Sequence, residues 1–236
     1  MMRREYEGEL RGPLRSLQQQ IVNCQLCPRL VDHRERKATT EKRTIFKEWD
    51  YWGAPVPAHG DQLARLLIIG LAPASHGANR TGRLFTGDRT ADFLTAALYR
   101  AGFASQPTSI NRHDNLRLVD VFETAVILCA PPNDKPQLAE LSSCRKFLVQ
   151  ELGLLKSVRA VLALGRVAFD NYLRAIEEST GRKFTLKFLH QGKFDLGDQL
   201  PVLFSSYHPS PRNTNTGRLT KEALDSVLSD VRHFLQ

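Results

Sequence analysis

The sequence predicts an α/β fold in which a parallel β-sheet is covered by helices on both faces. Three observations lead to this prediction. Short apolar runs typical of buried strands occur four times, a run of helical periodicity follows each of them, and most of them end in a polar loop rich in Gly and Pro. In such sheets, ligands bind beyond the carboxyl ends of the strands. We therefore expect the functional residues in the loops that follow the strands.

The first half of the chain predicts a helix, an irregular arm, a strand and a second helix. Residues 14–23 carry apolar residues at nearly helical spacing. Residues 32–59 are first charged and then aromatic and proline-rich, which predicts an irregular arm packed on the body. The apolar run 65–69 predicts a buried strand that ends at Gly70, and residues 90–100 then present one apolar helical face.

The second half continues the alternation. Its strands are uninterrupted apolar runs, as in strands covered on both faces, and each helix carries an apolar stripe. In the second of the helices, the stripe includes Cys144, which should face inward and meet Cys129 at the end of the preceding strand. The expected elements are, in order, a strand at 125–129, a helix at 138–152, a strand at 159–164, a helix at 167–176, a strand at 201–205 and a closing amphipathic helix through Leu224, Val227, Leu228, Val231 and Leu235.

Length and composition favour one basic domain. The chain of 236 residues, 42% of them hydrophobic, can form a single domain over 1–236, with an N-terminal arm over about 1–60. The net charge of +8, from 33 Lys and Arg against 25 Asp and Glu, favours nucleic acid as an anionic partner, while a basic protein without such a partner is the alternative. The sequence has no apolar run of transmembrane length, and Met1 to Glu7 lack a signal-peptide core, so we expect a cytosolic or nuclear protein that does not enter a membrane.

The four cysteines indicate a site closed by tertiary folding. Cys24 and Cys27 form a C-x-x-C pair, and Cys129 and Cys144 lie far downstream. In a reducing compartment, four such thiols are typical ligands of tetrahedral zinc or of an iron–sulfur cluster. Spacing alone does not decide between these two, and a redox dithiol or unrelated buried thiols are further alternatives.

The loop from Gly70 to Asp88 is the first candidate site. It is dense in Gly, Pro and small polar residues, which allow a backbone to approach a ligand closely, and it offers Ser75, His76 and the Phe85 ring beside the Asp88 carboxylate. It has neither the Walker pattern nor G-x-G-x-x-G, so the common nucleotide-cofactor fingerprints are not supported. An ordinary connection between strand and helix is the alternative.

Taken together, three loops provide what a flat nucleobase needs once it leaves a helix. Phe85 supplies a ring for stacking, Asn133 and Asn213 supply amides, and His208 supplies an imidazole beside the Asp88 carboxylate. A lone His after a strand is more often structural. His208 is a functional candidate because the other groups of this set are expected beside it.

Three motifs resemble those of the iron–sulfur uracil-DNA glycosylases, specifically the fifth family, called type B. They are Gly-Leu-Ala-Pro-Ala-x-His-Gly-Ala-Asn-Arg-Thr-Gly-Arg with Phe-Thr-Gly-Asp, then Cys-Ala-Pro-Pro, then His-Pro-Ser-x-x-Asn-x-x-Thr-Gly-Arg-Leu-Thr. The resemblance spans Cys24 to Thr220 and includes all four cysteines. It implies an α/β/α sandwich with a four-stranded parallel sheet and a structural 4Fe–4S cluster on Cys24, Cys27, Cys129 and Cys144.

The resemblance also implies an activity. It is the hydrolysis of the N-glycosidic bond of uracil and of other deaminated bases in double-stranded DNA, with hypoxanthine, and xanthine as a further candidate, among the substrates. Phe85 would stack on the flipped base, and His208 would donate a hydrogen bond to uracil O2. The implied base pocket is Gly70, Leu71, Ala72, Ser75, His76, Phe85, Asn133 and His208, and the implied DNA contacts are Ser210, Arg212, Asn213 and Arg218.

Several positions depart from the pattern of related families. Ala72 stands where most of them have a carboxylate, so Asp88 is our candidate to orient water and stabilise the sugar cation. Ala125 replaces an asparagine that reads uracil, which should relax specificity. Arg212 stands where better-known enzymes have a leucine wedge. In the Cys-Ala-Pro-Pro loop, Asn133 and Asp134 precede Lys-Pro, so Asp134 takes the usual asparagine position.

We therefore expect a monofunctional, monomeric base-excision enzyme that acts on nucleoid DNA in the cytoplasm of a prokaryotic cell. Two alternatives come from other classes of protein. One is a zinc-stapled nucleic-acid-binding protein without catalysis, and the other is an iron–sulfur electron carrier or sensor. Absorbance at about 400 nm separates the zinc protein from the two iron–sulfur proteins.

Overall fold

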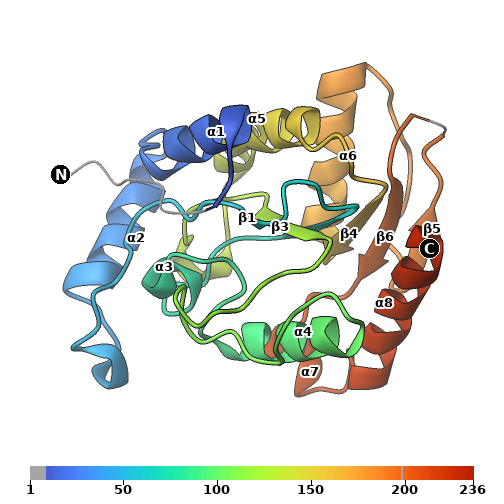
Figure 1. Ribbon diagram of the computed structural model, residues 1–236. Helices are drawn as coiled ribbons and strands as arrows, with labels where there is room; N and C mark the ends of the chain where they lie inside the picture. The colour runs from blue at the N-terminus through green and yellow to red at the C-terminus, as the bar shows by residue number, and fades with distance from the viewer. Residues whose placement is uncertain (1–8, 198) are drawn as a thin grey trace.

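A six-stranded sheet lies at the centre of the computed structural model, which describes residues 9–197 and 199–236 (Figure 1). The strand order is β1-β3-β2-β4-β6-β5. The four inner strands are parallel, and the outer strands β1 and β5 pair antiparallel with β3 and β6. The strands are β1 His59–Gly60, β2 Leu66–Gly70, β3 Val121–Ala125, β4 Ala160–Leu164, β5 Gly192–Phe194 and β6 Val202–Ser206.

Helices cover both faces of this sheet, because each central strand is apolar on both sides. In β2, Leu67 and Ile69 pack with α1, α5 and α6, whereas Leu66 and Ile68 pack with α4 and α8 on the opposite face (Figure 1). The predicted α/β/α sandwich with four parallel strands is confirmed. The helices are α1 Gly12–Val22, α2 Pro28–Thr39, α3 Ala78–Thr81, α4 Arg89–Arg100, α5 Leu138–Leu154, α6 Arg166–Thr180, α7 Pro211–Thr214 and α8 Lys221–Leu235, with 3-10 turns at η1 Thr44–Phe46 and η2 Pro132–Asp134.

The strand predicted at 125–129 is wrong, because β3 occupies Val121–Ala125. Glu123 and Thr124 interrupt the apolar pattern of this strand in the sequence, yet both side chains are buried and paired. Glu123 lies 2.9 Å from Nε2 of His59 on β1, and the Thr124 hydroxyl donates to Glu151 on α5 at 2.7 Å. The apolar run that follows is buried beside the turn after β2, where Val126 N–H donates to the Gly70 carbonyl. Cys129 therefore lies beyond the strand rather than at its end.

The arm predicted to be irregular over 32–59 is partly helical, since α2 extends to Thr39. Pro28 occupies the first turn of this helix, a position that suits proline. The inward face of α2 buries Leu30 and Arg34, while Asp32 and Arg36 are exposed on the outer face, so the charged stretch is an amphipathic helix. The segment Met1 to Glu7, expected to lack a signal-peptide core, lies outside the described residues.

None of the helices in the described part of the chain combines the length and the apolar character needed to cross a bilayer.

Candidate functional site

The end of β2 forms a platform for the Phe85 ring. A Cβ atom added to Gly70 would lie 2.6 Å from Phe85 Cζ, so only glycine allows the ring to lie against the backbone here. Phe85 itself has a φ of 45°, which is the left-handed region that side chains disfavour. Such strain persists only where the surroundings enforce it, and it concentrates at functional sites.

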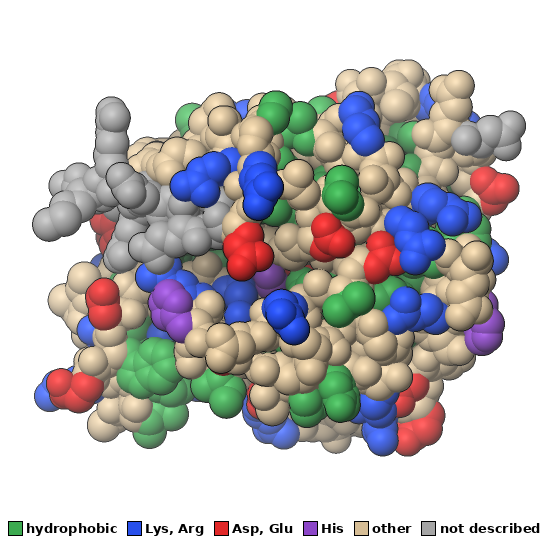
Figure 2. All heavy atoms as spheres, viewed as in Figure 1, with side chains coloured by type: hydrophobic (Ala, Val, Ile, Leu, Met, Phe, Trp, Pro, Cys, Tyr) green, Lys and Arg blue, Asp and Glu red, His purple; other side chains and the backbone are tan. Residues whose placement is uncertain are grey.

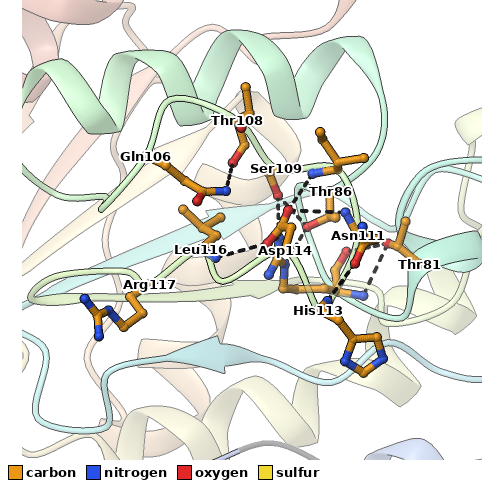
Figure 3. A network of polar contacts seen from close by, with 12 residues as sticks. Thr81, Thr86, Gln106, Thr108, Ser109, Asn111, His113, Asp114, Leu116 and Arg117 are labelled. Carbon is orange, nitrogen blue, oxygen red and sulfur yellow. Dashed lines mark hydrogen bonds and ion pairs between the residues drawn. The ribbon is translucent and has the colours of Figure 1, made fainter.

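A buried polar network enforces this conformation. Arg83 donates to Asp114 at 2.9 Å, to the Ser109 hydroxyl at 3.0 Å and to the Thr86 hydroxyl at 2.9 Å. Figure 3 shows Asp114 at the centre of this network, with Ser109 and Thr86 directed toward it. The network fixes the residues on both sides of Phe85 to the loop around Ser109. Arg83 is therefore a structural residue of the loop.

Asp88 caps the helix that follows. Its Oδ1 atom accepts the Ala91 N–H at 3.0 Å at the start of α4, and its carboxylate lies so close to Gly77 that a side chain there has no room. Burial raises the pKa of Asp88, while the backbone N–H groups of Ala91 and Thr90 and the nearby Arg80 oppose that rise. A buried carboxylate beside a cleft is a typical acid–base group.

Asp88 opens into a cleft of about 650 Å³, within the usual range for ligand sites. We call it the Asp88 cleft. Asn133 in the loop after β3 lines it too, and its backbone is left-handed, with a φ of 54°. The walls come from four segments: residues 74–77 and 80, residues 87–89 and 92, residues 109–110, and residues 133–134. The loops after β2 and β3 thus meet here, whereas the loop after β6, which the sequence analysis grouped with them, supplies no described residue to this cleft.

A fifth segment of the wall was not foreseen. The arm from α2 to η1 contributes Lys37, Arg43, Phe46 and Trp49 to the cleft, together with His33. The sequence analysis predicted only an irregular arm packed on the body and assigned it no part in the site. The spacing of Phe46 and Trp49 by three residues, typical of one helical face, is the signal that was available.

The arm also binds the two polar residues of the first loop. His33 Nε2 lies 3.1 Å from the Ser75 hydroxyl, and the Tyr51 hydroxyl lies 3.0 Å from His76 Nδ1. Burial lowers the pKa of His76 to about 4, so its ring is neutral at pH 7. Ser75 and His76 therefore hold the arm on the first loop, at the rim of the cleft.

His208 follows β6 and extends over the end of β4. Its Cβ atom would lie 3.3 Å from a Cβ atom added to Gly165, so the loop packs directly on that glycine. The Asn213 side chain donates to the His208 carbonyl at 2.8 Å and so holds the turn. Burial lowers the pKa of His208 to about 4, so the imidazole is neutral at pH 7. A neutral ring still provides one N–H donor.

The predicted DNA-contacting residues share the short loop around α7. Ser210 precedes the helix and its carbonyl accepts the Asn213 N–H at 2.9 Å. Arg212 is exposed, and the exposed Arg218 guanidinium lies over the Tyr207 ring at 4.3 Å. Arg89, next to Asp88, donates to Asn215 at 3.1 Å and ties this loop to the start of α4.

The structure separates the predicted base-pocket residues into two neighbouring groups. Ser75, His76 and Asn133 line the Asp88 cleft. The remaining ones lie at the strand ends, where Leu71 and Ala72 pack partly buried on the core. Within the described residues, neither Phe85 nor His208 lines the cleft. The loop from Gly70 to Asp88 connects the two groups, because it supplies residues to both.

All four cysteines line one apolar pocket, which Cys24, Cys27, Cys129 and Cys144 share with Arg34 and Phe147 among others. Burial raises the pKa of Cys129 to about 11 and also raises that of Cys144. Free thiols here are therefore protonated, and a metal that displaces the protons would hold thiolates. In residues 9–197 and 199–236, no group of three or more Cys, His, Asp or Glu is placed to hold a single ion.

Arg34 points to an anionic occupant of this pocket. Its side chain is fully buried, and it donates to Cys129 Sγ at 3.2 Å. Among the described residues, its Nε and Nη2 atoms have no hydrogen-bond partner, and Nη2 lies 3.6 Å from Glu35 Oε1. A buried guanidinium with free donors is costly unless negative charge lies beside it. The Glu35 carboxylate supplies part of that charge, and thiolate ligands of a metal cluster beside Cys129 would add to it, so the residues present fit such a group.

The matched family covers the strands and loops described above. Residues 57–232 match the family model described as the uracil DNA glycosylase superfamily. The chain belongs to the uracil-DNA glycosylase superfamily. The match begins before β1 and includes both loops of the Asp88 cleft and the His208 loop. The matched residues therefore include the whole sheet and the loops at its carboxyl edge.

Curated relatives place the chain within the fifth family. A type-5 uracil-DNA glycosylase of Mycobacterium leprae is 45% identical over 94% of this chain and 95% of its own length. A type-5 enzyme of Thermus thermophilus is 44% identical over 92% of this chain and 95% of its own length. A type-4 uracil-DNA glycosylase of Pyrobaculum aerophilum is 31% identical over 84% of this chain and 83% of its own length. The predicted family is confirmed.

Proposed function

We propose that this glycosylase hydrolyses the N-glycosidic bond of uracil and of hypoxanthine, and also of xanthine, in double-stranded DNA. The observation that carries the proposal is the half-buried Asp88 carboxylate, which opens into a cleft of about 650 Å³ on the same loop as the Phe85 platform. A flipped nucleotide needs a ring for stacking and a concave site for its base and sugar. The net charge of +8 favours the DNA backbone as partner.

Asp88 and water would carry out the hydrolysis. As the bond between C1′ and the base breaks, its electron pair leaves with the base, and positive charge develops on the sugar. The Asp88 carboxylate stabilises that cation and orients a water molecule, which adds its oxygen to C1′ and gives its proton to the carboxylate. That proton then passes to the departing base, which leaves neutral. Ala72, on the same loop, has no group for this work, so the nearby carboxylate takes the role.

His208 would stabilise the departing base. The electron pair that leaves with uracil is shared with O2, so a hydrogen-bond donor at O2 lowers the barrier. The burial that keeps His208 neutral leaves one N–H to donate without placing a full positive charge at the site. Phe85 would hold the ring of the base in the correct plane by stacking.

The end of β3 supports a relaxed specificity. Ala125 is the register partner of Gly70, so it lies at the end of β3 beside the glycine that carries the Phe85 ring. Its methyl group has no donor or acceptor with which to select the uracil edge, and a site without such readers discriminates weakly between bases. Asn133 and Asp134 line the cleft, and their polar side chains would hydrogen-bond to the base or to water.

The activity is tested with 30-mer duplexes that carry one uracil, hypoxanthine, xanthine or thymine, a length of about three helical turns. Incubation with enzyme, followed by alkaline cleavage of abasic sites, should cut the uracil and hypoxanthine strands. The thymine duplex should stay intact, because its base is not deaminated and its C5 methyl group needs extra room. Intact uracil strands under single-turnover conditions would contradict the proposal.

We also propose that Cys24, Cys27, Cys129 and Cys144 hold a 4Fe–4S cluster, which braces the two halves of the chain that bear them. The support is the shared pocket of the four thiols and the buried Arg34, which donates to Cys129 Sγ at 3.2 Å. The cluster supplies no step of the hydrolysis.

Anaerobically purified protein should be brown and absorb at about 400 nm, with about four irons per chain. Cys144→Ser should lose most of that absorbance and melt at a lower temperature, because the ligand set is incomplete. Leu138→Ala, an exposed change at the start of the same helix, is the matched control. A colourless protein with one zinc ion per chain would refute the cluster.

The enzyme would bind DNA as a monomer in a prokaryotic cytoplasm, with Ser210, Arg212, Asn213 and Arg218 against the backbone near the lesion. The exposed guanidinium groups of Arg212 and Arg218 on one short loop support this contact. The relatives come from Mycobacterium leprae, Thermus thermophilus and Pyrobaculum aerophilum, all of them prokaryotes.

A further inference from the structure

An exposed isoleucine stands at the edge of the Asp88 cleft. Ile45, in η1, is 76% exposed and lines the cleft, although burying such a side chain is normally favourable. Of the large exposed hydrophobic residues in the described part of the chain, Ile110 is the other one that lines the cleft, and it is 55% exposed. Figure 2 shows exposed hydrophobic side chains gathered at the lower left, where Figure 1 places the turn after α2.

The turn that carries Ile45 is rigid. The Phe46 and Trp49 rings meet edge to face, with centroids 5.8 Å apart, and both pack on the Arg80 guanidinium, at 3.9 and 4.1 Å. The Lys42 ammonium donates to the Trp49 carbonyl at 2.7 Å and closes the turn. Two cation–π contacts on one buried guanidinium hold the turn in a single position.

Arg80 connects this turn to the catalytic carboxylate. Its Nε donates to the His76 carbonyl at 2.8 Å, and its Nη2 donates to the Gly87 carbonyl at 2.7 Å. Gly87 directly precedes Asp88. The position of Ile45 is therefore fixed relative to Asp88 through one side chain and a few hydrogen bonds.

Cations lie near the exposed isoleucine, together with the exposed Glu48. Arg43 and Lys37 line the same cleft. Lys37 is paired with Glu41 at 2.6 Å, whereas Arg43 is exposed two residues before Ile45. Lys47 is exposed two residues after it. An apolar tip flanked by cations suits a duplex, in which phosphates lie on both sides of a groove and the stacked bases are apolar.

We propose that Ile45 enters the duplex and fills the space that the everted base leaves in the stack. This inference rests on the proposed base eversion. Apolar side chains inserted between base steps stabilise unstacked DNA, and eversion leaves a gap that otherwise collapses or fills with water. The α7 loop supplies no described residue to the Asp88 cleft, and its exposed Arg212 is charged, so the apolar group comes from η1 instead.

The test compares single-turnover excision by Ile45→Ala on three substrates. They are a uracil:guanine duplex, a uracil-containing single strand, and a duplex with pyrene opposite uracil, in which the large hydrocarbon fills the gap in advance. We expect the variant to lose about tenfold or more on the ordinary duplex and to stay within about twofold of the wild type on the other two. Ile45→Leu, which keeps an apolar group of the same size, should retain the duplex rate.

Two variants serve as controls. Leu63→Ala changes a side chain that is 68% exposed just before β2, at the sheet edge opposite the site, and should match the wild type on all substrates. Ile110→Ala tests the other wall of the cleft. The inference is overturned if Ile45→Ala loses nothing on the duplex, loses equally on all three substrates, or if the duplex-specific loss belongs to Ile110→Ala. Failure of the wild type on every uracil substrate would instead refute the proposed function.

Discussion

Asp88→Asn is expected to excise uracil about 100-fold or more slowly than the wild type, with its fold and its affinity for abasic DNA retained. The substitution removes the negative charge that stabilises the sugar cation and orients water. It keeps the helix cap, since Asn is as good an N-cap as Asp and can accept the same Ala91 N–H. A loss of rate in Asp88→Asn therefore reports the catalytic role of the negative charge and not the structural role of the helix cap.

Single-turnover rates, melting temperature and abasic-DNA binding measure these three properties. Asp88→Ala is the companion variant, because it also removes the cap and should cost about 1 kcal/mol in stability. Equal rates for Asp88→Asn and the wild type would dismiss Asp88 from catalysis. A parallel fall of rate and melting temperature would assign it to the fold alone.

The pH dependence follows from the same carboxylate. Burial raises the pKa of Asp88, and the ionised form is the active one. The rate should therefore fall as the pH decreases through that raised pKa, at a higher pH than for an ordinary Asp, whose pKa is about 3.9. In Asp88→Asn the residual rate should lack this acid limb. An identical limb in the variant would assign the titration to another group.

His208→Ala is expected to lower the excision rate by about 10² to 10³, which is typical for one lost donor at a developing anion. Binding to abasic DNA should change much less, because the product site no longer contains the base whose O2 the imidazole contacts. His208→Gln, which keeps a neutral N–H donor, should recover part of the rate. Equal losses in rate and in abasic-DNA affinity would indicate a purely binding role.

The neutrality of His208 gives a second measurement. Burial lowers its pKa to about 4, so between about pH 6 and 8 it does not titrate. The wild-type rate should show no inflection near 6.5, the usual value for histidine, and NMR of the imidazole should show a neutral ring at pH 7. A rate that rises on protonation near 6.5 would contradict a neutral donor.

Most of the fold follows from local patterns. The runs at 159–164 and 201–205 are apolar without interruption, and β4 and β6 lie within one or two residues of them. The position of β3 was not predicted correctly, because Glu123 and Thr124 look unsuited to a buried strand. Their partners, His59 and Glu151, come from elements far away in the sequence. The edge strands β1 and β5 have two and three residues, too few to leave a periodic signal.

The site was predicted in part for a similar reason. The loop from Gly70 to Asp88 is recognisable because glycines and small polar residues mark a close approach of backbone and ligand. The wall made by η1 is not, because Phe46 and Trp49 become part of the site only through Arg80. That contact joins segments about thirty residues apart, and no local pattern indicates it.

By itself, the sequence determined the alternation of strands and helices, the loops at the carboxyl edge of the sheet and the family to which the chain belongs. Only the tertiary structure decided that the four cysteines share one pocket with a buried arginine, and that the arm closes the cleft beside Asp88. The physical reason is the separation along the sequence over which each interaction acts. Periodicity and turn chemistry act between near neighbours, whereas burial, pKa shifts and the pairing of charges depend on side chains that meet only when the chain has folded.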